Sequence, residues 1–148
     1  NPEEPIDALS KVPYAEASFW MNWKSPYYNE THKAMRSELR AFCNKELKPV
    51  INPWEEKGKE PPLSIWQKMG GIGLLASRIG PGKHLKIFGK RLPGGVTPEK
   101  FDYFHELIAH EEMSALGCPG VQDGLGAGLV IGLPPVINFG DNNPELQK

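Results

Sequence analysis

The spacing of apolar residues in the first half of the chain constrains its fold most strongly. After Asn29, a residue type that caps helices, apolar residues recur at intervals of three and four, the period of one helix face. They are Met35, Leu39, Phe42, Cys43, Leu47 and Val50. The pattern predicts an amphipathic helix of about 18 to 20 residues. Pro49 ends or kinks this helix, because proline removes a helical hydrogen bond.

Two later stretches carry the same signal. The proline pair at 61–62 starts a short predicted helix with an apolar face made of Leu63, Trp66 and Met69, and the glycine pair at 70–71 closes it. Thr97 and Pro98 predict the cap and first position of a longer helix that ends near Leu116. Its apolar face comprises Phe101, Phe104, Leu107, Ile108 and Ala115.

No stretch alternates apolar and polar residues as a strand does, and no internal repeat is found. The predicted fold is therefore all-α, an orthogonal or up-down bundle of four to six helices. The predicted connections are a charged segment at 53–60, an apolar turn at 72–76 and a Gly- and Pro-rich loop at 80–95. Leu129 to Phe139 is expected to supply further buried surface.

Residues 1–28 are rich in proline and aromatic residues and predict an irregular arm that packs on the helical domain, residues 29–148, through its aromatic side chains. At the other end Pro144, preceded by two asparagines, predicts a helix that has barely begun at Lys148. Because one isolated turn is not stable, this end suggests a piece of a longer protein.

The composition excludes several classes of partner. With 148 residues, 39% hydrophobic content and a net charge of −1, the chain predicts one globular domain and gives no electrostatic reason to expect nucleic acid. No segment is expected to reach the roughly 20 apolar residues that a membrane span needs, so no membrane span is predicted. Cys43 and Cys118 lack metal or redox spacing and are expected to be free thiols. These features predict a soluble, intracellular protein.

Three motif-like segments favour ordinary structural roles. His105 and His110 resemble a zinc-protease pair but are five residues apart, about 140° around a helix, so they do not chelate one ion. The glycines at 124–128 lack the preceding strand and the third glycine of a dinucleotide loop. The basic loop residues Lys83, Lys86, Lys90 and Arg91 are more often a solvated surface than a phosphate site.

The Gly-rich apolar run at 117–132 predicts a close approach by another backbone or a ligand, because each glycine costs a helix about 1 kcal/mol relative to alanine. Within it Gln122, Gly126 and Val130 lie four residues apart, on one stripe of a helix.

Five segments taken together, in this order and spacing, resemble the N-terminal α-helical domain of the acyl-CoA dehydrogenases. They are residues 32–42, 63–74, 111–115, 120–122 and 137–148. The resemblance covers about Tyr28 to Lys148. It implies a flavoenzyme in which domains beyond this one hold most of the FAD and the catalytic carboxylate, which takes the α-proton of an acyl-CoA thioester while hydride leaves the β-carbon for the flavin.

The resemblance assigns no catalytic residue and no metal to this chain, and it implies that the isolated chain is inactive and that the complete protein is a homo-oligomer. It places Gln122, Gly126 and Val130 in the wall of the acyl pocket, where a glycine at 126 leaves room for long, branched or bulky chains. The arm and the basic loop depart from the usual family pattern and suggest an atypical subgroup. Two alternatives stay open: a related flavin oxidase acting on nitroalkanes or acyl-CoA, and a non-catalytic helical interaction module.

Overall fold

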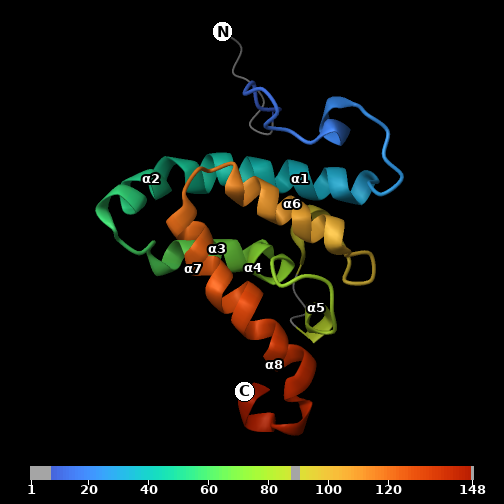
Figure 1. Ribbon diagram of the computed structural model, residues 1–148, viewed down its shortest axis with the longest axis vertical. Helices are drawn as coiled ribbons and strands as arrows, with labels where there is room; N and C mark the ends of the chain where they lie inside the picture. The colour runs from blue at the N-terminus through green and yellow to red at the C-terminus, as the bar shows by residue number, and fades with distance from the viewer. Residues whose placement is uncertain (1–7, 88–90, 148) are drawn as a thin grey trace.

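The structure is a computed structural model that describes residues 8–87 and 91–147. The regular structure within these ranges is helical, without a strand, which confirms the predicted all-α class (Figure 1). Six α-helices have seven or more residues: α1 (Glu30–Phe42), α2 (Lys48–Lys57), α3 (Leu63–Gly71), α6 (Tyr103–Ser114), α7 (Pro119–Gly126) and α8 (Leu133–Phe139). Two single turns, α4 (Leu74–Ser77) and α5 (His84–Ile87), connect α3 to the second half of the chain.

Helices α1 and α6 lie side by side and form the centre of the domain (Figure 1). Met35 and Leu39 of α1 are fully buried, as are Ile108 and Ala109 of α6. Burial of each such side chain removes apolar surface from water, which stabilises the folded state by about 25 cal/mol for every Å² buried. The apolar face predicted for the first helix is confirmed at Met35 and Leu39 of α1 and at Cys43 and Leu47 of the π-helical turn (Cys43–Leu47) that follows, while Phe42 and Val50 are half-buried at its margin.

The helix that starts at Glu30 does not end at Pro49. A π-helical turn (Cys43–Leu47) follows α1, and Pro49 then occupies the first turn of α2, where its missing N–H is not needed. The chain stays helical as far as Lys57, and Gly58 ends it with a φ of 58°. The predicted connection at 53–60 is therefore wrong over its first half.

The helix predicted to begin at Pro98 begins five residues later, at Tyr103. The N–H groups of Lys100 and Phe101 both donate to the Thr97 carbonyl, which makes one isolated turn before Phe101 enters the core. Asp102 is the actual cap of α6: its carboxylate accepts from the N–H groups of Phe104 and His105.

Three residues assigned to apolar faces lie outside the core. Leu63 is 70% exposed, so α3 instead buries Ile65 and Met69. Leu107 of α6 and Ala115, which caps the end of α6, are exposed, and the buried face of this helix includes two polar residues, His105 and Glu112. The apolar turn at 72–76 does enter the core, where Leu74 of α4 is fully buried.

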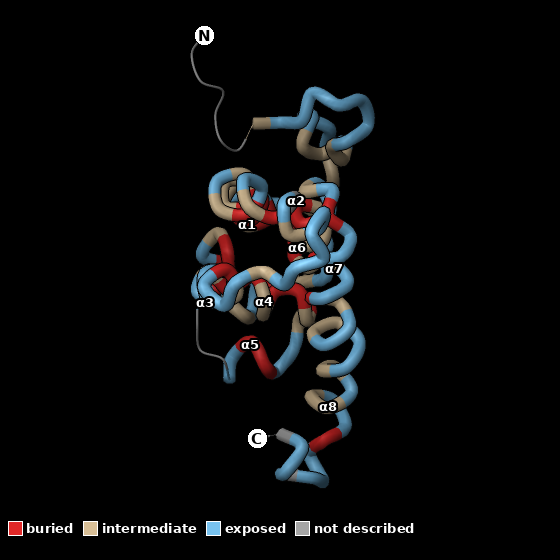
Figure 2. Tube along the Cα trace, turned by 90° about the vertical axis from the view of Figure 1, so that its left-hand side faces the viewer, coloured by how far each residue is buried: buried red, intermediate tan, exposed pale blue. Residues whose placement is uncertain are grey.

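A long helical segment leaves the core at the C-terminal end of the described chain. It consists of α7, a π-helical stretch (Ala127–Gly132) and α8, and Figure 2 shows its far part exposed. Leu129 to Phe139 was predicted to be buried, but Ile131 and Phe139 are 73% and 83% exposed and no residue of α8 is buried. The last described turn, Pro144–Gln147, is a 3-10 helix, and Lys148 lies outside the described residues.

By length and composition alone, the stretch Pro119–Asn142 is apolar enough to cross a membrane, with a mean hydropathy of 1.3 over its best window. The sequence alone did not predict this stretch, because Pro134 and Pro135 interrupt the apolar run. They lie in the first turn of α8, where the helix continues through them. A single stretch of this kind is weak support for a membrane span.

Candidate functional site

The predicted stripe lies along the first half of the projecting helical segment, in α7 and the π-helical stretch that follows it. Its three members, Gln122, Gly126 and Val130, are all half-buried, while the neighbouring Val121 and Leu125 point into the core. A Cβ added at Gly126 would meet no atom within 4 Å. The glycine therefore is not required by packing inside this chain, and the space beside it is open.

Gln122 borders a small cavity at the start of α7. The cavity has a volume of about 340 Å³ and is lined by Ser114, Gly117, Cys118, Pro119, Gln122 and Asp123. The Gln122 side-chain amide donates to the Ser114 hydroxyl at 2.7 Å, which fixes its orientation. Gly126 and Val130 do not line this cavity. The three residues of the stripe therefore lie along one side of the helical segment but do not all face one cavity.

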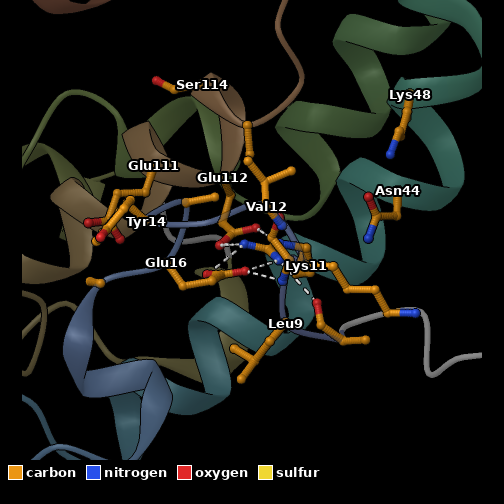
Figure 3. Close-up of a pocket in the computed structure, with 16 residues that line it drawn as sticks. Leu9, Lys11, Val12, Tyr14, Glu16, Asn44, Lys48, Glu111, Glu112 and Ser114 are labelled. Carbon is orange, nitrogen blue, oxygen red and sulfur yellow. Dashed lines mark hydrogen bonds and ion pairs between the residues drawn. The ribbon is translucent and has the colours of Figure 1, made fainter.

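A larger cleft of about 950 Å³ lies between the arm and the helical domain (Figure 3). The arm contributes residues 8–12 and 14–17, and the domain contributes Arg40, Asn44, Lys48, Glu111, Glu112, Ser114 and Ala115. Burial, together with the nearby carboxylates of Glu112 and Glu16, raises the pKa of Glu111. The sequence analysis did not predict this cleft, because its two walls are about 30 to 100 residues apart in the chain.

Four buried charges anchor the arm above α1 and α6. Glu16 of the arm accepts hydrogen bonds from Arg40, at 2.7 Å, and from Arg36, at 3.3 Å. On the other side Glu112 of α6 pairs with Arg40, with 2.9 Å between Nη2 and Oε1. Burial raises the pKa of Glu16, but the hydrogen bonds from Arg40 and Ser10 outweigh it and keep the pKa below its usual value. Two cations and two carboxylates balance, so the buried cluster carries no net charge.

Aromatic side chains hold the rest of the arm, as predicted, but only some of them. Tyr28 stacks on Phe19 with ring centroids 4.8 Å apart and contacts Phe104 of α6 at 5.2 Å. Tyr14 and Trp23 are instead exposed.

His32, Asp102 and His105 bring three potential metal ligands together at the N-terminal ends of α1 and α6. The imidazoles of His32 and His105 are stacked, with centroids 3.7 Å apart and planes 20° from parallel. A metal ion must lie in the plane of each imidazole that binds it, and two nearly parallel planes do not meet close to the rings. The cluster therefore does not fit a metal ion.

The same three residues fit a capping role. His32 Nδ1 accepts from the Asn29 N–H at 3.1 Å, which leaves the proton on Nε2 to be donated to Asp102 at 3.0 Å. His105 Nδ1 accepts from the Asp102 N–H at 3.2 Å. Burial and the neighbouring His32 lower the pKa of His105, which favours its neutral form.

Acidic residues of the same chain neutralise the described part of the basic loop. Lys83 pairs with Asp141 at 2.7 Å, Lys86 with Glu99 at 3.5 Å, and Arg91 with Glu38. Lys90 lies outside the described residues. These pairs favour the solvated-surface interpretation over a phosphate site.

The two cysteines are buried free thiols, as predicted. Burial, with the nearby carboxylate of Glu112, raises the pKa of Cys43 to about 12, so this thiol is protonated and unreactive at neutral pH.

Comparison with known proteins decides the family. A profile of the acyl-CoA dehydrogenase N-terminal domain matches residues 29–144. The chain belongs to the acyl-CoA dehydrogenase family. The match begins at Asn29, the residue that caps α1, and includes Gln122, Gly126 and Val130.

Curated acyl-CoA dehydrogenases are similar over most of the chain. One from Alternaria alternata is 34% identical over 134 residues, covering 88% of this chain and 30% of that protein. Another, from Emericella nidulans, is 33% identical over 143 residues, covering 95% and 32%. The mitochondrial short-chain specific acyl-CoA dehydrogenase of Bos taurus is 27% identical over 118 residues, covering 80% and 25%. The chain thus spans between a quarter and a third of the length of these relatives. No solved structure matches.

Proposed function

We propose that this chain forms the N-terminal domain of an FAD-dependent oxidoreductase that dehydrogenates an acyl-CoA thioester between its α and β carbons. In the complete enzyme it contributes to the wall of the acyl pocket. The observation that carries the proposal is the family match over residues 29–144. Family membership supports this reaction class, and the half-buried stripe on α7 and the π-helical stretch after it is the surface that we assign to the substrate.

Gly126 is the centre of the proposed wall. A Cβ added at this position would meet no atom of the described residues within 4 Å, apart from its own helical turns. Gln122 and Val130 flank it on the same helical segment and are also half-buried. An acyl chain lying along this stripe would meet an amide at one end and an aliphatic side chain at the other.

The larger cleft has no excess of positive charge that would favour a pyrophosphate. It is lined by three carboxylates, those of Glu16, Glu111 and Glu112, and by three basic side chains, those of Lys11, Arg40 and Lys48. Arg40 is already paired with Glu16 and Glu112. We therefore expect the remainder of the enzyme to make most of the contacts with FAD, as the family implies, and this chain to make few.

The first test is the visible absorption spectrum of the complete protein, before and after addition of a long-chain acyl-CoA without oxygen. We expect a flavin spectrum that the thioester bleaches. A protein that is colourless, and that stays colourless after FAD is added, contradicts the proposal and favours the interaction module. Rapid reoxidation by oxygen, with hydrogen peroxide as product, identifies the acyl-CoA oxidase alternative, and bleaching by a nitroalkane identifies the nitroalkane oxidase.

The second test addresses the pocket wall. Gly126→Leu in the complete enzyme should shift kcat/KM toward shorter acyl chains, because the new side chain fills volume beside the substrate. One or two methylenes of lost depth correspond to about 10- to 200-fold discrimination. Gly124→Leu is the matched control, since Gly124 lies on the same helix but is exposed. An unchanged preference in the Gly126 variant, or an equal change in the control, removes Gly126 from the pocket.

A further inference from the structure

Arg78 is buried at the C-terminal end of α4 without a carboxylate partner. Its side chain is 2% exposed, and its Nε and Nη1 atoms have no hydrogen-bond partner. Its Nη2 contacts only the Nδ1 atom of His110 on α6, at 3.5 Å. Within residues 8–87 and 91–147, no ion pair joins this guanidinium to Asp or Glu.

The other arginines of the chain are arranged differently. Arg36 and Arg40, which are also buried, both contact the carboxylates of Glu16 and Glu112. The exposed Arg91 pairs with Glu38. Each of the other guanidinium groups therefore contacts a carboxylate of this chain. The guanidinium of Arg78, the most deeply buried of them, does not.

The charge on Arg78 needs compensation. Burial lowers its pKa, but a guanidinium stays protonated in proteins, so the side chain is a buried cation. Removing an unpaired charge from water costs several kcal/mol. Buried polar groups without partners are rare enough in folded proteins that an unseen ion is a standard explanation for one.

The neighbouring side chains do not provide the missing negative charge. Burial and the charge of Arg78 lower the pKa of His110, so this imidazole is neutral. Glu106 lies 3.7 Å from His110 Nε2, on the opposite side of the ring from Arg78. Its carboxylate packs against Gly80, where an added Cβ would be 2.7 Å from Oε2. One positive charge is left uncompensated beside a neutral histidine.

We propose that Arg78 binds a small monovalent anion of the chloride class between α4 and α6. A single negative charge neutralises the guanidinium, whereas a dianion such as phosphate would leave a buried negative charge. The ligand must be small, because the Arg78 side chain is only 2% exposed. A water molecule would satisfy hydrogen bonds but not the charge.

The structural test uses crystals of the complete protein soaked in sodium bromide, since bromide replaces chloride and scatters anomalously. We expect an anomalous peak in contact with Nε or Nη1 of Arg78. Water density without an anomalous signal, or an aspartate or glutamate from the remainder of the protein at this place, overturns the proposal.

The solution test measures the thermal midpoint of the complete protein in sodium chloride and in sodium gluconate at equal ionic strength. Gluconate is too large to reach a buried guanidinium. We expect chloride to raise the midpoint relative to gluconate, by about 1 °C for roughly a fivefold excess over its dissociation constant in a protein of this expected length. Arg78→Met should abolish this difference, because it removes the charge while keeping an unbranched apolar chain.

Arg91→Met is the matched control and should keep the chloride effect, since Arg91 is exposed and paired. If Arg78→Met does not fold, Arg78→Lys replaces it and should weaken the effect. Equal chloride effects in the wild type and the Arg78 variants overturn the proposal. A bromide peak without any chloride effect in solution marks an adventitious ion only and also overturns it.

Discussion

Gly94 sets the distance between the turn at 93–95 and helix α1. Its φ of 72° lies in the left-handed region, and an added Cβ would lie 2.4 Å from the backbone nitrogen of Met35. The N–H of Gly94 also donates to the Glu38 carboxylate at 2.6 Å. From the sequence, Gly94 and Gly95 are indistinguishable loop glycines. Only the structure shows which one touches a helix that begins more than 60 residues earlier.

Replacing Gly94 by alanine should therefore destabilise the protein far more than replacing Gly95. Gly95 has a similar φ of 68° but open space around it, so Gly95→Ala incurs only backbone strain, about 1 kcal/mol. Gly94→Ala adds a steric clash with backbone atoms and should exceed about 2 kcal/mol. Urea unfolding midpoints of the complete protein measure both. Equal losses would mean that the turn moves freely away from α1.

At the scale of elements, the two central helices share their N-terminal caps. The Asp102 carboxylate caps α6 and also accepts from His32 of α1, so one side chain serves both helices. The cap of α1 at Asn29 was predictable because a capping residue stands directly before the apolar period. The start of α6 was not predictable, because Thr97 and Pro98 form an equally good local capping signal. The turn that begins there ends where Phe101 enters the core.

Asp102→Ala should loosen both helix ends, whereas Asn29→Ala should loosen only that of α1. Loss of one capping side chain costs about 1 kcal/mol, and here the loss at Asp102 also leaves the buried His32 Nε2 without its acceptor. Hydrogen exchange of the complete protein, followed by mass spectrometry, separates peptides from the two ends. Faster exchange confined to α6 in the Asp102 variant would show that the link between the helices contributes no stability.

The whole molecule consists of a core around α1 and α6 and a helical segment that extends away from it (Figure 2). The sequence predicted the helical class, most of the buried face of α1 and the buried turn at Leu74, because these depend on local periodicity. It did not predict the exposure of α8. Periodicity shows which residues form an apolar face, but it does not show whether other residues of this chain pack over that face. Periodicity likewise does not predict the buried ion pairs among Glu16, Arg36, Arg40 and Glu112, because these pairs join segments that are far apart in the sequence. The stripe at Gln122, Gly126 and Val130 stays a prediction.

This exposed segment should make the chain self-associate when it is produced without the remainder of the protein. Ile131 and Phe139 present large apolar side chains to water, and contiguous patches of this kind drive association. Replacing both by aspartate should shift the chain toward monomer in sedimentation velocity over a concentration series, with circular dichroism checking that helicity is kept. Leu63→Asp is the matched control, because Leu63 is 70% exposed on α3, away from the segment, and should leave association unchanged. A monomeric wild-type chain at every concentration, or equal effects of the two replacements, would show that the segment covers its apolar face by itself.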